Sequence, residues 1–187
     1  MEHFGFLADN IALEHVAFSP KQLLQKCKTE ALSFIKEKDV ALQINCNTDI
    51  YHTVFGDPAR LHQLCMYLIL NGIRHTNEGA VKAFLEITPE PDNNCNISLA
   101  FTDSGIGMTM TEVASIFAPF NNPHLTPKYS GECKCLTSTI SLARAMGGDI
   151  KIESIKGLGT RIVFSCVFET PIDAYANNIY GVNIANN

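Results

Sequence analysis

The sequence predicts an α+β fold, a two-layer α/β sandwich in which helices cover one face of a mixed, mostly antiparallel sheet. Segments with apolar residues at helical spacing are separated by stretches in which apolar and polar residues alternate. A glycine turn joins the last two alternating stretches as a hairpin. With 187 residues, 46% of them hydrophobic, the chain can bury the core that these layers need.

Four segments carry helix signals, at residues 19–36, 57–72, 111–117 and 136–146. Ser19 and Asp57 are N-cap residues, and each is followed by a proline, which the first turn of a helix accepts. The last helix stops at Gly147 and Gly148. The spacing of apolar residues gives the second helix a core face that extends to Gly72.

Alternation predicts strands at residues 12–18, 40–44, 81–87, 97–101, 149–153 and 161–168. The last two strands form a hairpin around Gly157-Leu158-Gly159. Residues 89–96 are polar and are predicted to form a hairpin-like loop. Residues 118–131 are rich in Pro, Asn, Ser and Gly, and they predict a long loop before the last helix.

Composition limits the possible partners and the compartment. With 14 Lys and Arg against 19 Asp and Glu, the net charge of −5 provides no basic field for nucleic acid or anionic lipid. The seven cysteines are odd in number and irregularly spaced, and no signal peptide is visible, so reduced thiols and a cytoplasmic location are expected. No apolar stretch approaches the roughly 20 residues of a membrane span. Direct membrane contact by this fragment is therefore not expected, although it can be the cytoplasmic part of a membrane-anchored protein.

The run Asp103-Ser104-Gly105-Ile106-Gly107-Met108 follows directly after a predicted strand. A strand that ends in an acidic residue and two closely spaced glycines makes a turn where backbone lines a pocket. The Asp103 carboxylate would then be fixed and partly desolvated, and suited to accept a hydrogen bond from an amino-substituted ring such as adenine. Asp and Gly are also ordinary turn residues, so these residues alone leave both interpretations open.

Further segments complete an ordered series: residues 55–61 leading into 68–76, then 103–108, Ile116-Phe117-Ala118-Pro119-Phe120, and 145–150 with 157–160. In that order they resemble the N, G1 and F boxes and the C-terminal hairpin of the ATP-binding catalytic domain of sensor histidine kinases. That domain has the Bergerat fold of the GHKL group, shared with gyrase B, Hsp90 and MutL. The resemblance covers roughly residues 10–168.

The resemblance implies ATP and Mg²⁺ as ligands. Asn71 would ligate Mg²⁺ together with the phosphates, since this ion accepts amide oxygens. Arg74 would contact phosphate oxygens and His75 would pack against adenine. These residues at i, i+3 and i+4 share one helix face, and the alternative is that all three merely face solvent.

The resemblance also implies roles in the turn and the hairpin. Asp103 would receive the adenine amino group. Gly105 and Gly107 would let the backbone approach the nucleotide. Thr160 would support the adenine pocket from the hairpin, although Gly-Thr before a strand is a common pair.

The long loop corresponds to the lid of the family. Phe117 and Phe120 flank it, and they either anchor the lid or simply pack in the core. The second glycine box, whose backbone cradles phosphates, corresponds here to Gly131-Glu132-Cys133-Lys134-Cys135-Leu136, where only Gly131 remains. If the lost glycines needed a positive φ, each cysteine would cost about 1–2 kcal/mol. Lys134 would partly compensate by reaching a phosphate.

By resemblance, the chain is the catalytic domain of a multidomain phosphorelay histidine kinase. It would supply the γ-phosphoryl of ATP to a histidine in a separate helical dimerisation domain, and no catalytic residue within the chain is assigned. A receiver or phosphotransfer domain is the expected further partner. Residues 1–10 would end an upstream helical or linker segment, 11–168 form the domain, and 169–187 form a tail or linker. The alternative is a degenerate pseudokinase that binds ATP weakly or not at all and acts by docking.

Overall fold

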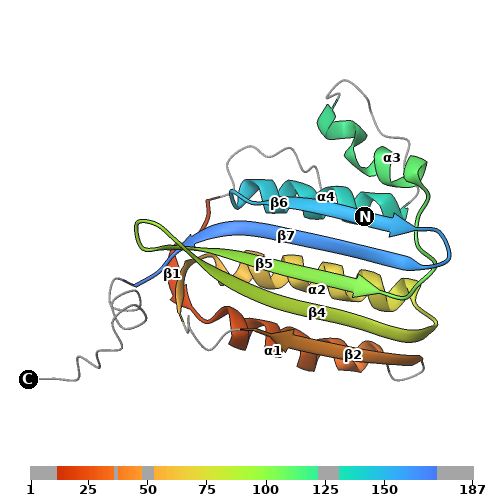
Figure 1. Cartoon of the computed structure of the whole chain (residues 1–187), viewed down its shortest axis with the longest axis horizontal. Coiled ribbons are helices and arrows are strands. Elements are labelled where there is room, and N and C mark those ends of the chain that lie inside the picture. Colours follow the sequence, from red (N-terminus) through yellow and green to blue (C-terminus); the bar gives the residue numbers. More distant parts are fainter. Residues whose placement is uncertain (1–11, 36–37, 48–52, 122–130, 172–187) are drawn as a thin grey trace, which may run out of the picture.

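The chain, described by a computed structural model over residues 12–35, 38–47, 53–121 and 131–171, folds as an α/β sandwich (Figure 1). Its elements in chain order are β1 (Val16–Phe18), α1 (Pro20–Ala31), a 3₁₀ helix (Leu32–Phe34), β2 (Asp39–Cys46), β3 (Val54–Gly56), α2 (Pro58–His75), β4 (Glu78–Glu90), β5 (Asn94–Asp103), α3 (Met110–Asn121), α4 (Gly131–Ala145), β6 (Asp149–Ile155) and β7 (Gly159–Glu169). The strands form one sheet.

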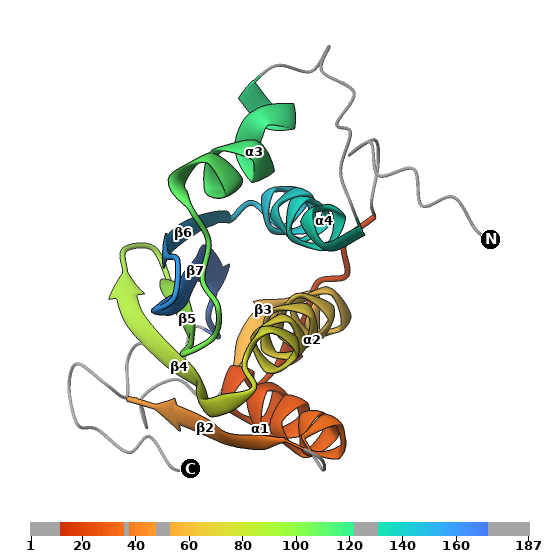
Figure 2. The same ribbon diagram turned by 90° about the vertical axis from the view of Figure 1, so that its right-hand side faces the viewer.

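The sheet is mixed and mostly antiparallel, which confirms the predicted fold class. Its order is β1-β3-β7-β5-β4-β2, and β6 pairs with β7 beside this path. Only β2 and β4 run parallel among the described pairs. The helices α1, α2 and α4 lie on one face of the sheet, and α3 lies beyond the β6 side (Figure 2).

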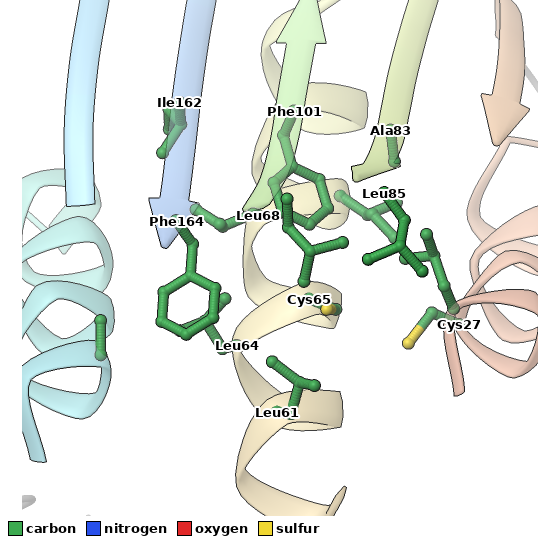
Figure 3. Close-up of a cluster of buried hydrophobic side chains, with 14 of the residues drawn as sticks. Cys27, Leu61, Leu64, Cys65, Leu68, Ala83, Leu85, Phe101, Ile162 and Phe164 are labelled. Carbon is green, nitrogen blue, oxygen red and sulfur yellow. The ribbon is translucent and has the colours of Figure 1, made fainter. Parts of the chain in front are cut away.

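The core lies between this sheet face and α2. Alternate residues of the central strands are buried, as period-2 patterning requires, and they include Leu85, Phe101 and Phe164. These side chains meet the apolar stripe of α2, among which Leu64 and Leu68 are almost completely buried (Figure 3). The helix therefore sits directly on the strands that end at the candidate site.

Cysteines take part in this core. Cys27 of α1 and Cys65 of α2 are fully buried between the two helices, and the contact with Cys27 together with burial raises the pKa of the Cys65 thiol. Burial also raises the pKa of both Cys95 and Cys166 to about 11. Cys27, Cys65, Cys95 and Cys166 are buried as thiols and pack as small apolar residues do.

The predicted hairpin-like loop at 89–96 is a hairpin, but its turn is shorter than predicted. β4 and β5 pair through this region, with Thr88 opposite Asn96 and Glu90 opposite Asn94. The chain reverses within a tight turn in which Asp92 and Asn93 have φ values of 59° and 57°. Both values belong to a type I′ turn, which accepts Asp and Asn. The strands here are rich in polar residues, so the alternation of hydrophobicity was hidden.

Helix ends differ from the predicted ones by several residues. α1 ends at Ala31 rather than Lys36, and a 3₁₀ turn follows it. α3 continues through Pro119 to Asn121, and α4 begins at Gly131, so both ends of the predicted 118–131 loop are helical. Pro119 lies in the last turn of α3, where the loss of one N–H donor interrupts little of the helix. The rest of that loop, 122–130, lies outside the described residues.

The short strand β3 was not predicted, because three residues show no usable alternation. The division into segments 1–10, 11–168 and 169–187 stays a prediction, since residues 1–11 and 172–187 lie outside the described part. Within the described residues, no helix combines the length and the apolar character needed to cross a membrane.

Asp57 joins the incoming chain to α2. Its Oδ1 accepts a hydrogen bond of 2.9 Å from the Arg60 N–H, which is the predicted N-cap. Its Oδ2 accepts one of 3.1 Å from the N–H of Glu14. The side chain is 6% exposed, so both bonds are partly shielded from water.

Replacing Asp57 by alanine should lower the free energy of unfolding by about 1–2 kcal/mol, because it removes the cap of α2 and leaves two partly buried N–H groups without this partner. Asp57→Asn keeps one acceptor oxygen and should lose less. Urea denaturation measures both changes. A wild-type midpoint in Asp57→Ala would contradict this account of the cap.

Candidate functional site

A cavity of about 110 Å³ lies where the end of α2, the end of β5, the starts of α3 and α4, and the β6–β7 turn meet. Five of the residues predicted from sequence line it: Asn71, His75, Asp103, Gly107 and Thr160. Six further residues complete the wall: Ile106, Met108, Glu112, Ile116, Leu136 and Lys156. Residues that are far apart in the chain therefore share one cavity, whose wall contains both polar and apolar side chains.

Asp103 supplies the acidic group of the cavity. Its Oδ1 accepts a hydrogen bond of 2.9 Å from the Gly105 N–H. Burial raises the pKa of the Asp103 carboxyl, while backbone N–H groups of Gly105 and Thr160 and the nearby His75 oppose the rise. The carboxylate is thus partly desolvated, and a hydrogen-bond donor on a ligand would compensate for the lost hydration.

The two glycines of the turn have different surroundings. Gly107 has a φ of +58°, and a Cβ there would overlap the carbonyl of Ile155. Gly105 lies off the cavity wall, and a Cβ there would overlap the carbonyl oxygen of His75. Gly105 therefore lets the turn approach α2, whereas its predicted role was to let the backbone approach a ligand.

Thr160, which is 8% exposed, belongs to a hydroxyl network between the hairpin and the turn. The Oγ of Ser154 lies 2.9 Å from Oγ1 of Thr160, donates to the carbonyl of Gly159 at 3.0 Å, and accepts from the Met108 N–H at 2.8 Å. Since a serine hydroxyl has one proton, Thr160 must donate to Ser154, which leaves lone pairs on Oγ1 of Thr160 for a ligand or water. Ser154 was missed in the sequence.

The predicted triad on α2 is not brought together as a whole. Asn71 and His75, four residues apart, both line the cavity. The Arg74 side chain is exposed and is not part of the cavity wall. A residue at i+3 is rotated away from the i and i+4 pair, and here this rotation places Arg74 outside the cavity.

Phe117 and Phe120 do not line the cavity. Both are half-buried and pack against the core, which agrees with the packing interpretation. The guanidinium of Arg144 lies 4.5 Å above the ring of Phe120 and ties α4 to the end of α3. Their neighbour Ile116 provides the wall residue from α3.

The segment that replaces the second glycine box is the start of α4. Gly131 and Lys134 were predicted to lie near phosphates, and only their backbone belongs to the described part. Because α4 begins at Gly131, Cys133 and Cys135 have right-handed helical backbone. The predicted strain from positive φ is therefore absent, and that argument for weak binding is wrong.

Glu112 and Lys156 lie at the cavity without having been predicted. The Glu112 carboxylate accepts from the backbone N–H of Thr109 at 2.7 Å, and Thr109 Oγ1 accepts from the Glu112 N–H at 3.2 Å. This is a capping box, and the hydrogen bonds from Thr109 lower the pKa of Glu112. Lys156 Nζ lies 3.7 Å from Glu112. The Thr-x-x-Glu spacing was a signal in the sequence that could have located the start of α3.

A family model and curated relatives match the chain. The family model described as "Histidine kinase-, DNA gyrase B-, and HSP90-like ATPase" matches residues 56–170. The chain is 31% identical over 166 residues to hybrid signal transduction histidine kinase F of Dictyostelium discoideum, covering 87% of this chain and 15% of that protein. It is 26% identical over 159 residues to the histidine-protein kinase BarA of Escherichia coli K12, covering 84% and 17%. The chain thus spans less than a fifth of these relatives.

Solved structures share the fold. Full-length ShkA in complex with AMPPNP superposes with a TM-score of 0.66 at 22% identity, over 88% of this chain and 33% of that one. The nucleotide-free catalytic domain of histidine kinase ThkA gives a TM-score of 0.60 at 17% identity, over 86% and 99%. By family model, relatives and fold together, the chain belongs to the histidine kinase-, DNA gyrase B- and HSP90-like ATPase family, as an ATP-binding domain of the sensor histidine kinase type.

Proposed function

We propose that the cavity binds the adenine end of Mg-ATP and that the chain is the catalytic domain of a multidomain sensor histidine kinase. One observation carries this proposal. Asn71 from α2 and Asp103 from β5 line the same cavity, although 32 positions separate them in the sequence. An amide oxygen for a metal ion and a desolvated carboxylate for a base are thereby available within one site.

Adenine suits the donors and acceptors of the cavity. Its exocyclic amino group would donate to Asp103, and Thr160 offers a second acceptor nearby. Guanine has a carbonyl oxygen at the corresponding ring position and would face the carboxylate with a lone pair. Ile106, Met108 and Leu136 provide apolar surface for the ring faces.

The size of the cavity limits what it encloses. About 110 Å³ is below the roughly 300–1,000 Å³ typical of sites for whole ligands, so a base fits and the phosphates would lie at the mouth. Leu136 lines the cavity, and α4 begins five residues earlier, at Gly131. The first N–H groups of a helix have no partner within the helix, and together with the positive end of the helix dipole they favour phosphate.

Asn71 would be the protein ligand of Mg²⁺. This ion commonly keeps several waters and is held by one or two protein oxygens plus substrate phosphates. The described residues contain no group of three or more His, Cys, Asp or Glu side chains placed to hold a metal. A site completed by the nucleotide fits this donor set.

The phosphoryl acceptor would be a histidine of a separate helical dimerisation domain, and a receiver or phosphotransfer domain would act next. The support is that the relatives are histidine kinases, two of them named hybrid, of which this chain covers 15%, 17% and 7%. A cytoplasmic location, where ATP is available, belongs to the same proposal. Within the chain, the work is to bind and orient the nucleotide, since phosphoryl transfer depends on position and charge neutralisation.

Asn71→Ala should weaken Mg-ATP binding by about 10- to 100-fold, because it removes an oxygen that contacts a charged centre. Arg74→Ala is the matched control, since Arg74 is three residues further along α2 and its side chain lies outside the cavity wall. Titration calorimetry with wild type should give a dissociation constant below about 1 mM. Equal losses in the two variants, or no binding by wild type, would refute the proposed site.

Asp103→Asn should abolish most adenine affinity and yet raise the melting temperature of the nucleotide-free chain at pH 7. A raised pKa means that the folded state favours the protonated Asp103 carboxyl. The stability gained from this preference is fully present below the usual pKa of 3.8 and is lost as pH rises through the folded-state pKa. The gain in the variant should therefore shrink as pH falls toward that value. Thermal denaturation across pH measures it.

Asp149→Asn is the control for this pH dependence, because Asp149 is exposed and lies 3.8 Å from Arg144. It should not raise the melting temperature. An Asp103→Asn variant whose melting temperature falls below wild type at pH 7 would show that burial of this carboxylate is not a cost.

A further inference from the structure

Lys38, the residue before β2, contacts the end of α2. Its Nζ donates to the carbonyl oxygens of Ile73 at 2.7 Å, Arg74 at 3.0 Å and Thr76 at 3.0 Å. An ammonium has three N–H donors, so all of them are used. Carbonyls in the last turn of a helix lack a partner within the helix, and a cation there also complements the helix dipole.

The sheet topology explains why Lys38 is at this place. β2 pairs in parallel with β4, and Asp39 lies opposite Glu78 (Figure 1). The residue that precedes β2 therefore lies beside the turn from α2 into β4. A lysine there is long enough to reach back to the carbonyls of the helix that has just ended.

The glycine turn binds the same helix end. The Ile106 N–H donates to the carbonyl of His75 at 3.2 Å, and Gly105 packs closely against that oxygen. The carbonyls of four consecutive residues, 73–76, are thus divided between Lys38, which takes three, and the turn, which takes one. Asn71 and His75 on the helix, with Ile106 and Gly107 on the turn, line the cavity.

We propose that Lys38 is a positioning residue of the nucleotide site, holding the last turn of α2 so that Asn71, His75 and the glycine turn keep their places around the cavity. Lys38 is not part of the cavity wall. The proposal rests on the proposed function, because it assigns Lys38 to the same site. It differs from a purely stabilising role in a measurable way: loss of Lys38 should disturb the turn and the affinity more than an equal loss of stability elsewhere does.

The test compares variants of the whole chain with two readouts. Amide hydrogen exchange at Ile106, measured by NMR without nucleotide, reports the bond between the turn and α2. Calorimetric titration with Mg-ATP reports affinity. The variants are Lys38→Met, which keeps the stem without the charge, and Lys38→Arg, which keeps charge and donors in a planar arrangement.

Two controls accompany them. Lys82→Met changes an exposed lysine of β4 in the same way. Val54→Ala removes buried volume in β3 and lowers stability without touching the cavity wall.

In Lys38→Met we expect faster exchange at Ile106 and a dissociation constant weakened by roughly 3- to 10-fold. Lys38→Arg should recover part of both, Lys82→Met should match wild type, and Val54→Ala should lower the melting temperature without weakening binding.

The proposal is overturned if Lys38→Met matches wild type in affinity and Ile106 exchange, or if Val54→Ala weakens binding as much at equal loss of melting temperature. Should Lys38→Met fail to fold, Lys38→Arg decides: exchange at Ile106 and a dissociation constant that both lie outside the range of the two controls would support the proposal, and values that match wild type in both readouts would overturn it. If the wild-type chain bound no Mg-ATP, the proposed function would be refuted. Exchange at Ile106 in wild type and Lys38→Met would still show whether Lys38 holds the turn.

Discussion

The close approach of α2 to the sheet at Gly72 is the constraint on which the site depends. A Cβ at this position would lie 3.1 Å from a methyl group of Val81 and 3.4 Å from the Cβ of Asp103. The contact with Val81 would be tight and the contact with Asp103 ordinary. A residue larger than glycine would therefore press α2 against β4. Since Asn71 precedes Gly72, this contact also sets how near the amide of the helix lies to the carboxylate at the strand end.

Some groups of the site destabilise the domain when no ligand is bound, and others stabilise it. The Asp103 carboxyl is desolvated before any ligand arrives, as its raised pKa indicates. Its surroundings are held by hydrogen bonds between distant segments, among them the Ser154 hydroxyl network and the Lys38 contacts at the helix end. A rigid frame around an unsatisfied acceptor is what selective binding of a donor requires, because a flexible frame would let water or the backbone satisfy the carboxylate.

Local chemistry made much of the fold predictable. The caps at Ser19 and Asp57 and the glycine hairpin at 157–159 lie where the residues indicated, because each depends on neighbours within four positions. The hairpin-like loop at 89–96 was predicted too long, because the polar strand ends beside its turn show little hydrophobic contrast. For the site, the order of motifs indicated Asn71, His75, Asp103, Gly107 and Thr160, which do share a cavity. Arg74 lies outside the cavity wall, because one helix position of rotation decides whether a side chain faces a cavity, and its contact with phosphate stays a prediction.

The sequence by itself determined the fold class, the polarity of the site and the position of the acidic turn, since periodicity, capping residues and glycine placement act over short range. Only the tertiary structure decided which residues meet across elements. Lys38 reaches α2 because β2 pairs with β4 in parallel, and Lys156 reaches the cavity because a hairpin folds beside α3. These contacts come from the packing of distant segments, and no local pattern records the partner of a side chain that lies 35 or more residues away.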